Sequence, residues 1–70
     1  MTKLEKIRKA TESMGFKRGR NEGSYVVYYY RYEEFEEALC TLYEFKGRME
    51  YAGMPYKYKL VGNNEVIVRF

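Results

Sequence analysis

The segment that most constrains the fold is residues 23–32, a run of aromatic and β-branched residues that begins at a glycine. Such side chains favour a pleated, half-buried backbone. Turn-forming residues precede the run and a glutamate-rich segment follows it, so it has the ends of a single strand. Its two faces are almost equally apolar, whereas a strand at the surface of a core needs only one apolar face. The second face is therefore either buried as well or available to a partner.

Amphipathic periodicity predicts a first helix over residues 2–14, whose apolar side chains fall on one side. Thr2 and Glu5 have the spacing of a capping box, in which each residue satisfies a backbone N–H of the other. Gly15 stands where a helix C-terminus is expected.

A second helix is predicted to start at Glu33, because four glutamates crowd a first turn where negative charge favours the helix dipole. Two interpretations of its end are open. The helix ends at Lys46-Gly47, or Lys46 extends its amine to solvent and the helix continues to Gly53. Met49 returns to the apolar side, which favours continuation.

Alternating patterns predict two β-hairpins. The paired segments are residues 16–20 (interrupted by Gly19) with 24–31 through a turn at 21–23, and residues 56–61 with 65–70 through a turn at 62–64. The order helix, hairpin, helix, hairpin (αββαββ) predicts one α+β domain over residues 1–70. Its expected form is a two-layer sandwich, with both helices on one face of a four-stranded antiparallel sheet. Residues 14–17 and 54–57 are similar, so either an αββ repeat or chance explains this order.

Strand alternation assigns the side chains to the two faces of the sheet. The residues expected to face the helices are Val26, Tyr28, Tyr30, Tyr56, Tyr58, Leu60, Val66, Val68 and Phe70. Those expected on the other face are Tyr25, Val27, Tyr29, Arg31, Lys57, Lys59, Ile67 and Arg69. A one-residue bulge would exchange the two sets in the first hairpin.

Composition narrows the chemistry that the chain can perform. The sequence has no histidine and one cysteine, Cys40, which excludes histidine-based catalysis, Cys–His nucleophiles and most zinc sites. Cys40 is expected to be an exposed bystander, and the glutamates after Tyr32 to be a solvated helix turn rather than metal ligands. We therefore predict no catalytic residues, no metal ligands and no cofactor, with an enzyme of unrecognised type as an alternative.

The charge distribution is uneven. Residues 1–32 hold eight lysines and arginines against three glutamates, whereas residues 33–70 hold five against seven, and the net charge is +3. The folded molecule is expected to be a charge dipole. A lone cysteine suits a reducing compartment, residues 1–13 do not resemble a signal peptide, and no apolar stretch reaches the ~20 residues of a membrane span. These features predict a cytoplasmic protein without a membrane segment.

Leu4, Ile7, Gly15-Phe16, Arg20 and Gly23-Ser24 resemble the opening of HicA-type mRNA interferases, small toxins related in fold to double-stranded RNA-binding domains. That family has a catalytic histidine directly after its Gly-Ser, where this chain has Tyr25. The long helix at Glu33 also departs from the family's order. The resemblance covers about a third of the chain and implies no nuclease activity.

The residues expected to bind a partner are Tyr25, Tyr29, Arg31, Lys57, Lys59 and Arg69. Tyrosine and arginine anchor many protein interfaces, which favours a non-enzymatic regulator or inhibitor that binds a protein. A nucleic-acid-processing complex, of the kind that small phage and mobile-element proteins block, is one such partner. The alternative is direct binding of single-stranded RNA or DNA, with tyrosines stacking on bases and basic side chains on phosphates. A homodimer through this face, or exposed tyrosines without a partner, are further alternatives.

Overall fold

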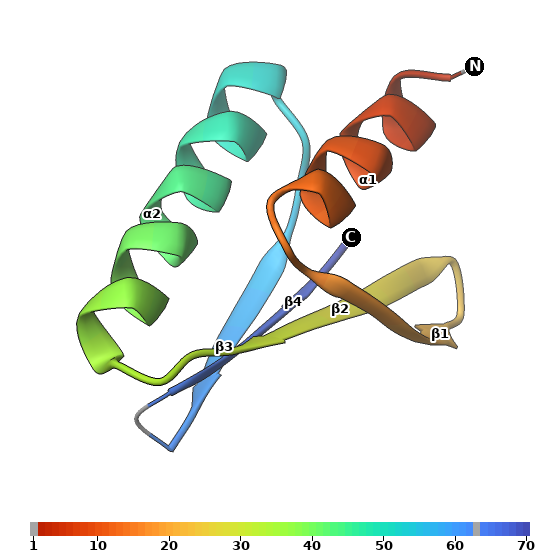
Figure 1. Ribbon diagram of the computed structural model, residues 1–70. Helices are drawn as coiled ribbons and strands as arrows, with labels where there is room; N and C mark the ends of the chain where they lie inside the picture. Colours follow the sequence, from red (N-terminus) through yellow and green to blue (C-terminus); the bar gives the residue numbers. More distant parts are fainter. Residues whose placement is uncertain (1, 63) are drawn as a thin grey trace.

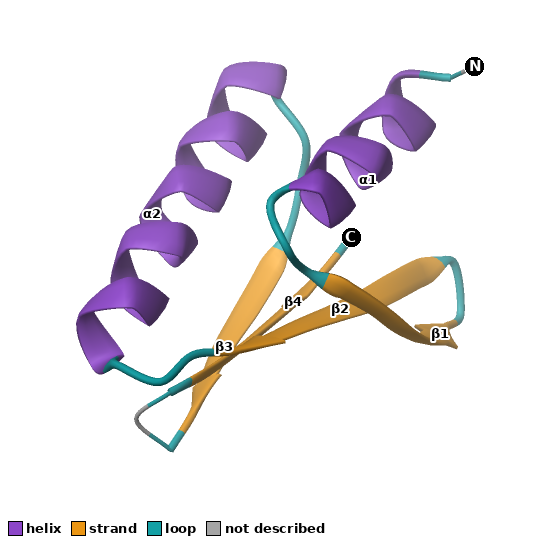
Figure 2. Cartoon of the chain, viewed as in Figure 1, coloured by secondary structure: helices purple, strands orange, loops and turns teal. Residues whose placement is uncertain are grey.

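A computed structural model describes residues 2–62 and 64–70 of the chain. The elements in order are α1 (Lys3–Ser13), β1 (Lys17–Glu22), β2 (Tyr25–Arg31), α2 (Phe35–Ala52), β3 (Lys57–Val61) and β4 (Glu65–Arg69). The strands form one antiparallel sheet in the order β1-β2-β4-β3, and both helices lie on the same side of it (Figures 1 and 2). The predicted α+β architecture with αββαββ order is confirmed. Within the described ranges, no helix combines the length and apolarity needed to cross a membrane.

Helix α1 is one residue shorter at each end than predicted, with Thr2 as its N-cap and Met14 as its C-cap. The backbone N–H of Glu5 donates to Thr2 Oγ1 (3.2 Å), so Thr2 is the N-cap. After the helix, Gly15 adopts a φ of +107°, and a Cβ at this position would lie 2.1 Å from the ring of Tyr30. Glycine is therefore required at this turn both by the backbone and by the packing.

Helix α2 begins later than predicted and ends where the longer interpretation places it. Its first residue is Phe35, so Glu33 precedes the helix and only two of the four glutamates lie in its first turn. The helix continues past Lys46 to Ala52 and stops at Gly53, which adopts the left-handed conformation (φ +67°). Lys46 is tolerated within the apolar pattern because its Nζ atom lies over the ring of Tyr58, 4.9 Å from the centroid.

The first hairpin differs from the prediction in its turn and in its register. The turn consists of Gly23 and Ser24, not residues 21–23, because Glu22 still pairs with Tyr25. The ladder also contains a β-bulge. The pairs on either side of the bulge are Arg18 with Tyr28 and Asn21 with Val26. Gly19 and Arg20 therefore lie together opposite one residue of β2. Because the extra residue is in β1, the alternation of β2 is preserved.

The second hairpin pairs β3 with β4 without a register shift, from Lys57 opposite Arg69 to Val61 opposite Glu65. Its predicted turn at residues 62–64 includes Asn63, which lies outside the described residues. The neighbouring Gly62 has a φ of +61°.

The pairing registers relate the two αββ halves. Lys57 pairs with Arg69, and these residues follow the paired Lys17 and Tyr29 by forty positions. The same offset separates the similar segments 14–17 and 54–57. The central ladder between β2 and β4 is also symmetric under this offset, because Tyr28 pairs with Val68, forty positions later. The flanking pair Val27–Arg69 then corresponds to the pair Tyr29–Ile67 on the other side. The two hairpins are thus equivalent by an approximate two-fold rotation, and the bulge in β1 is the departure from it.

The core lies between the sheet and the helices, as the alternation predicted. Its buried apolar residues are Phe16, Val26, Tyr28, Tyr32, Ala38, Leu42, Phe45, Met49, Val66, Val68 and Phe70. Tyr28 is fully buried, and its ring stacks on Phe70 with centroids 5.5 Å apart. The exception is Tyr58, which was expected inside but is 49% exposed because β3 is an edge strand.

Candidate functional site

The sheet has one face that no helix covers, here called the open face. Its side chains are Lys17, Arg20 and Glu22 of β1, Tyr25, Val27, Tyr29 and Arg31 of β2, Glu65, Ile67 and Arg69 of β4, and Lys57, Lys59 and Val61 of β3. All six residues predicted to bind a partner are on this face. Tyr25 and Tyr29 are 48% and 41% exposed.

Cross-strand pairing orders the open face into rows, because directly paired residues of neighbouring strands lie side by side. One row runs Lys17, Tyr29, Ile67, Lys59, and the next runs from Arg20 through Val27 and Arg69 to Lys57. The middle of the first row is apolar and both of its ends are basic. With strands about 4.8 Å apart, the two rims of the face are roughly 14 Å from one another.

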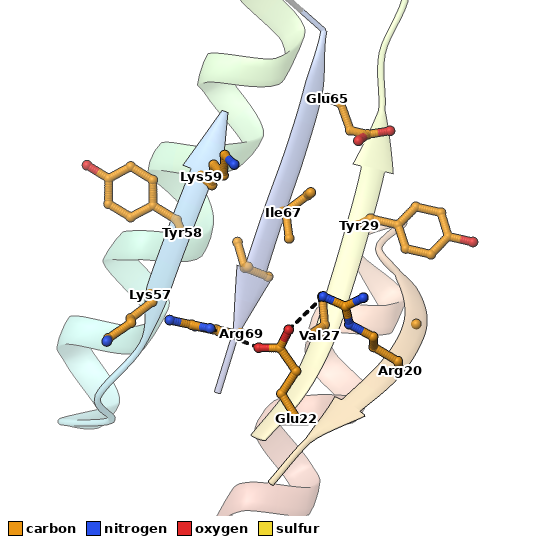
Figure 3. A pocket seen from close by; sticks show the side chains of 12 residues that line it. Arg20, Glu22, Val27, Tyr29, Lys57, Tyr58, Lys59, Glu65, Ile67 and Arg69 are labelled. Atoms are coloured by element: carbon orange, nitrogen blue, oxygen red, sulfur yellow. Dashed lines mark hydrogen bonds and ion pairs between the residues drawn. The ribbon is translucent and has the colours of Figure 1, made fainter. Parts of the chain in front are cut away.

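Four of the predicted residues surround one hollow on the open face (Figure 3). They are Tyr29, Lys57, Lys59 and Arg69. Tyr25, beside the β1–β2 turn, and Arg31, at the other end of β2, lie outside the lining of this hollow. The prediction therefore identified the face, but the hollow is formed by a subset of those residues together with others.

An ion-pair bridge crosses one side of the hollow. Glu22 accepts hydrogen bonds from Arg20 Nη2 and Arg69 Nη1, each 2.8 Å long (Figure 3). These guanidinium groups hold the pKa of the Glu22 carboxyl below its usual value. The bridge links β1 to β4 across β2, and it occupies both arginines in the free protein.

The remaining charges give the open face a positive excess. A second ion pair joins Arg31 to Glu65 (3.1 Å). Among the described residues, Lys17, Lys57 and Lys59 have no acidic side chain within ion-pair distance. Six cations against two carboxylates leave the face at +4, while the other glutamates lie elsewhere, most of them on or beside α2. The rest of the molecule carries seven cations against eight carboxylates, so the positive excess lies on the open face, whose cations come from both halves of the chain rather than from the first half alone.

Sequence reasoning missed Arg20 and Glu22 as parts of this site. In a regular β1 strand both side chains would point toward the helices, and the bulge places them on the open face. A signal was available, since an isolated glycine such as Gly19 within a strand pattern is typical of a bulge. A Cβ at Gly19 would lie 3.2 Å from the carbonyl oxygen of Val27.

The tyrosines whose pKa values are shifted lie in the core and not on the open face. Burial raises the pKa of Tyr28 and of Tyr32, so both hydroxyls stay protonated, and both residues belong to the core. Cys40 is exposed, as expected, on α2, away from the hollow. In the described part of the chain, no three acidic, histidine or cysteine side chains are grouped so that they could hold a metal ion.

In comparisons with known proteins, no family model, curated protein or solved structure matches this chain. The partial resemblance to HicA-type mRNA interferases therefore has no support from a family match. The class that the fold and the site define is a small two-layer α+β protein with an open, basic, tyrosine-containing sheet face.

Proposed function

We propose that the protein is a small non-enzymatic regulator or inhibitor that binds an acidic surface of a partner protein through its open face. The observation that supports this proposal is the row from Lys17 to Lys59, in which Tyr29 and Ile67 form an apolar centre between two basic rims. An apolar centre within a polar rim is the usual anatomy of a protein interface. Carboxylates around an apolar patch on the partner would complement both parts of this row.

Direct binding of single-stranded RNA or DNA is the second candidate. The +4 charge of the face and the half-exposed rings of Tyr25 and Tyr29 favour it, because such binders combine basic grooves with aromatic stacking platforms. Glu22 and Glu65 favour a protein instead. Both carboxylates lie on the face and would repel phosphate, whereas hydrogen-bond donors of a protein surface can use them.

Paired alanine substitutions test the open face. We expect Tyr29→Ala with Lys59→Ala to weaken partner binding by about tenfold or more, since central aromatic residues carry much of the binding energy of an interface. The matched control is Tyr51→Ala with Lys9→Ala, which removes the same residue types from exposed positions on the helices. Each variant is used as bait in extracts of the native host, and the affinity of the recovered partner is then measured with the purified components.

The two candidates give different results in a salt titration. Binding of single-stranded RNA or DNA that falls linearly on a log–log salt plot would favour the nucleic-acid candidate, and absence of such binding at low salt would exclude it. A partner that both double variants retain equally would exclude the open face. If the melting temperature of the Tyr29 and Lys59 variant falls as far as that of a variant of the buried Tyr28, these side chains support the fold instead.

A further inference from the structure

The two edges of the sheet are not alike. Strands β1 and β3 are each paired on one side only, and they are equivalent under the approximate two-fold relation. Strand β1 is interrupted by its bulge and consists of charged and polar residues with one glycine. Strand β3 pairs without interruption along all five of its residues, and within the described ranges no further segment hydrogen-bonds to its outer edge. A regular strand with one free edge is a template for another strand.

Exposed apolar side chains lie on β3 and on one stripe of α2. At about 100° per residue, Phe35, Lys46 and Tyr43 lie within about 80° of one another around α2 and form one stripe. The two aromatic side chains of this stripe are 46% and 62% exposed. On the strand itself, Tyr58 and Val61 are 49% and 38% exposed. Four of the seven large apolar side chains exposed among the described residues therefore lie on β3 or on this stripe of α2.

The stripe and the strand are in contact. Lys46 Nζ lies 4.9 Å from the ring centroid of Tyr58 and 5.9 Å from that of Tyr43, so one cation joins the α2 stripe to β3. Figure 3 shows the ring of Tyr58 projecting from β3 on the side away from Ile67 and β4. The Tyr58 ring thus extends past the edge of the sheet, on the helix side of the place where an added strand would lie.

We propose that the outer edge of β3 is a second binding site, which takes an extended segment of a partner protein as a fifth strand. Successive side chains of such a segment point to opposite faces of the sheet. Those on the helix side would meet Tyr58 and Tyr43, and those on the open side would meet Lys57 and Lys59, which have no ion-pair partner among the described residues. The ligand is therefore a peptide segment that alternates apolar with acidic residues, and its backbone supplies the hydrogen bonds.

A second copy of this chain fits the edge less well. When β3 pairs antiparallel with β3 of another molecule about Lys59, that lysine lies opposite its own equivalent. When the pairing is centred on Tyr58, Lys57 lies opposite Lys59 of the second copy. Like charges directly opposite one another destabilise a strand pair, whereas an acidic segment turns the same positions into ion pairs.

The probe is a synthetic peptide of about seven residues that alternates glutamate with valine, blocked at both ends. Its control has the same composition with the valines and glutamates in two blocks. Amide shifts of the ¹⁵N-labelled protein during titration locate the binding site. We expect shifts along β3 and the facing side of α2, and weaker binding of the block peptide by about tenfold, because it cannot present one residue type to each face.

Methylation of single peptide nitrogens tests the strand geometry. Only alternate N–H groups of an added strand point at its neighbour, so the loss of affinity should alternate from one position to the next. Among protein variants, Tyr43→Ser should weaken binding about fivefold or more. Tyr51→Ser should leave binding unchanged, because Tyr51 of the same helix lines a pocket with Lys6 and Ile7 of α1. Tyr29→Ser should also leave it unchanged, which separates this site from the open face.

Several results would overturn the proposal. Equal effects of methylation at every position would show that the peptide does not add as a strand. Amide shifts confined to β1 and β2 would assign the peptide to the open face, and no shifts at about 1 mM peptide would leave no site of useful affinity. A concentration-dependent molecular mass together with protected β3 amides in the free protein would show that a second copy is the occupant.

Discussion

The adjacent residues Tyr28 and Tyr29 allow a direct test of which face of β2 is inside. Both are tyrosines in the middle of the same strand, so a change to threonine at either position has the same intrinsic effect on strand formation. Tyr28 has no exposed surface and stacks on Phe70, whereas Tyr29 is 41% exposed on the open face. Loss of about 120 Å² of buried ring from Tyr28 costs about 3 kcal/mol at 25 cal/mol per Å². The cavity that remains raises this cost to about 3–5 kcal/mol.

The corresponding loss at Tyr29 is about 1.5 kcal/mol, because about half of the ring is already in water and no closed cavity forms. In a domain of this size, 1 kcal/mol corresponds to a shift of about 4–8 °C in the melting temperature. With this conversion, Tyr28→Thr should lower the melting temperature by at least about 12–24 °C, and Tyr29→Thr should lower it by about 6–12 °C. Urea and thermal unfolding followed by circular dichroism measure both. Equal losses, or a larger loss for Tyr29, would refute the orientation of β2.

Three further predictions concern stability. Gly47→Ala should stabilise the protein by about 1 kcal/mol, because alanine favours a helix more than glycine does and the site within α2 has open space around it. Gly15→Ala should destabilise the protein by more than about 1 kcal/mol, because Gly15 has a positive φ and a Cβ there would meet the Tyr30 ring. Denaturant midpoints that rank the two variants the other way would contradict this. Tyr28→Phe should leave stability unchanged or raise it by up to about 1 kcal/mol, since the buried hydroxyl has no hydrogen-bond partner among the described residues; a clear loss in urea unfolding would show that the hydroxyl is bonded. Glu22→Gln should lower the urea midpoint most above pH 4.5, the unperturbed carboxyl value. The folded pKa is depressed, so the wild-type advantage is lost as the pH falls through that pKa, and a pH-independent difference would exclude the ion pairs as its cause.

Most of the architecture could be predicted because it follows from local signals. Three signals each act within a short segment: the capping spacing at Thr2, the glycines after both helices, and the two-residue periodicity of the strands. The first two indicate where a helix begins or ends, and the third indicates which face of the sheet a side chain is on. The start of α2 was placed too early because glutamates suit the positions just before a helix as well as its first turn. Tyr58 was placed inside because alternation reports the face of a residue and not its distance from the sheet edge.

The composition of the candidate site depended on one non-local feature. Alternation assigned Tyr29, Lys59 and Arg69 to the open face, where the structure has them. The ion-pair bridge at Glu22 could not be predicted in the same way, because it requires both the bulge in β1 and the β2–β4 register, which together bring Arg69 within reach. Those pairings join residues far apart in the sequence, and periodicity within one strand carries no information about them.

Deletion of Gly19 tests what the bulge contributes. The deletion would leave Arg20 as the single residue opposite Val27, and the pairs on either side would keep their register. The open face and the bridge at Glu22 should therefore persist, with a change in stability of about 1 kcal/mol or less. The deletion would give β1 a regular edge, equivalent to that of β3 under the approximate two-fold relation. Because a bulge is one way in which proteins prevent a strand edge from pairing with another molecule, its loss should make the β1 edge available for pairing.

We accordingly expect the deletion variant to remain folded, to retain a depressed Glu22 pKa and to self-associate more than the wild type. Light scattering across a concentration series measures the association, and titration by NMR measures the pKa. A folded variant that stays monomeric would show that the charges of β1 protect this edge by themselves. An unfolded variant would show instead that the bulge is needed for the twist of the sheet.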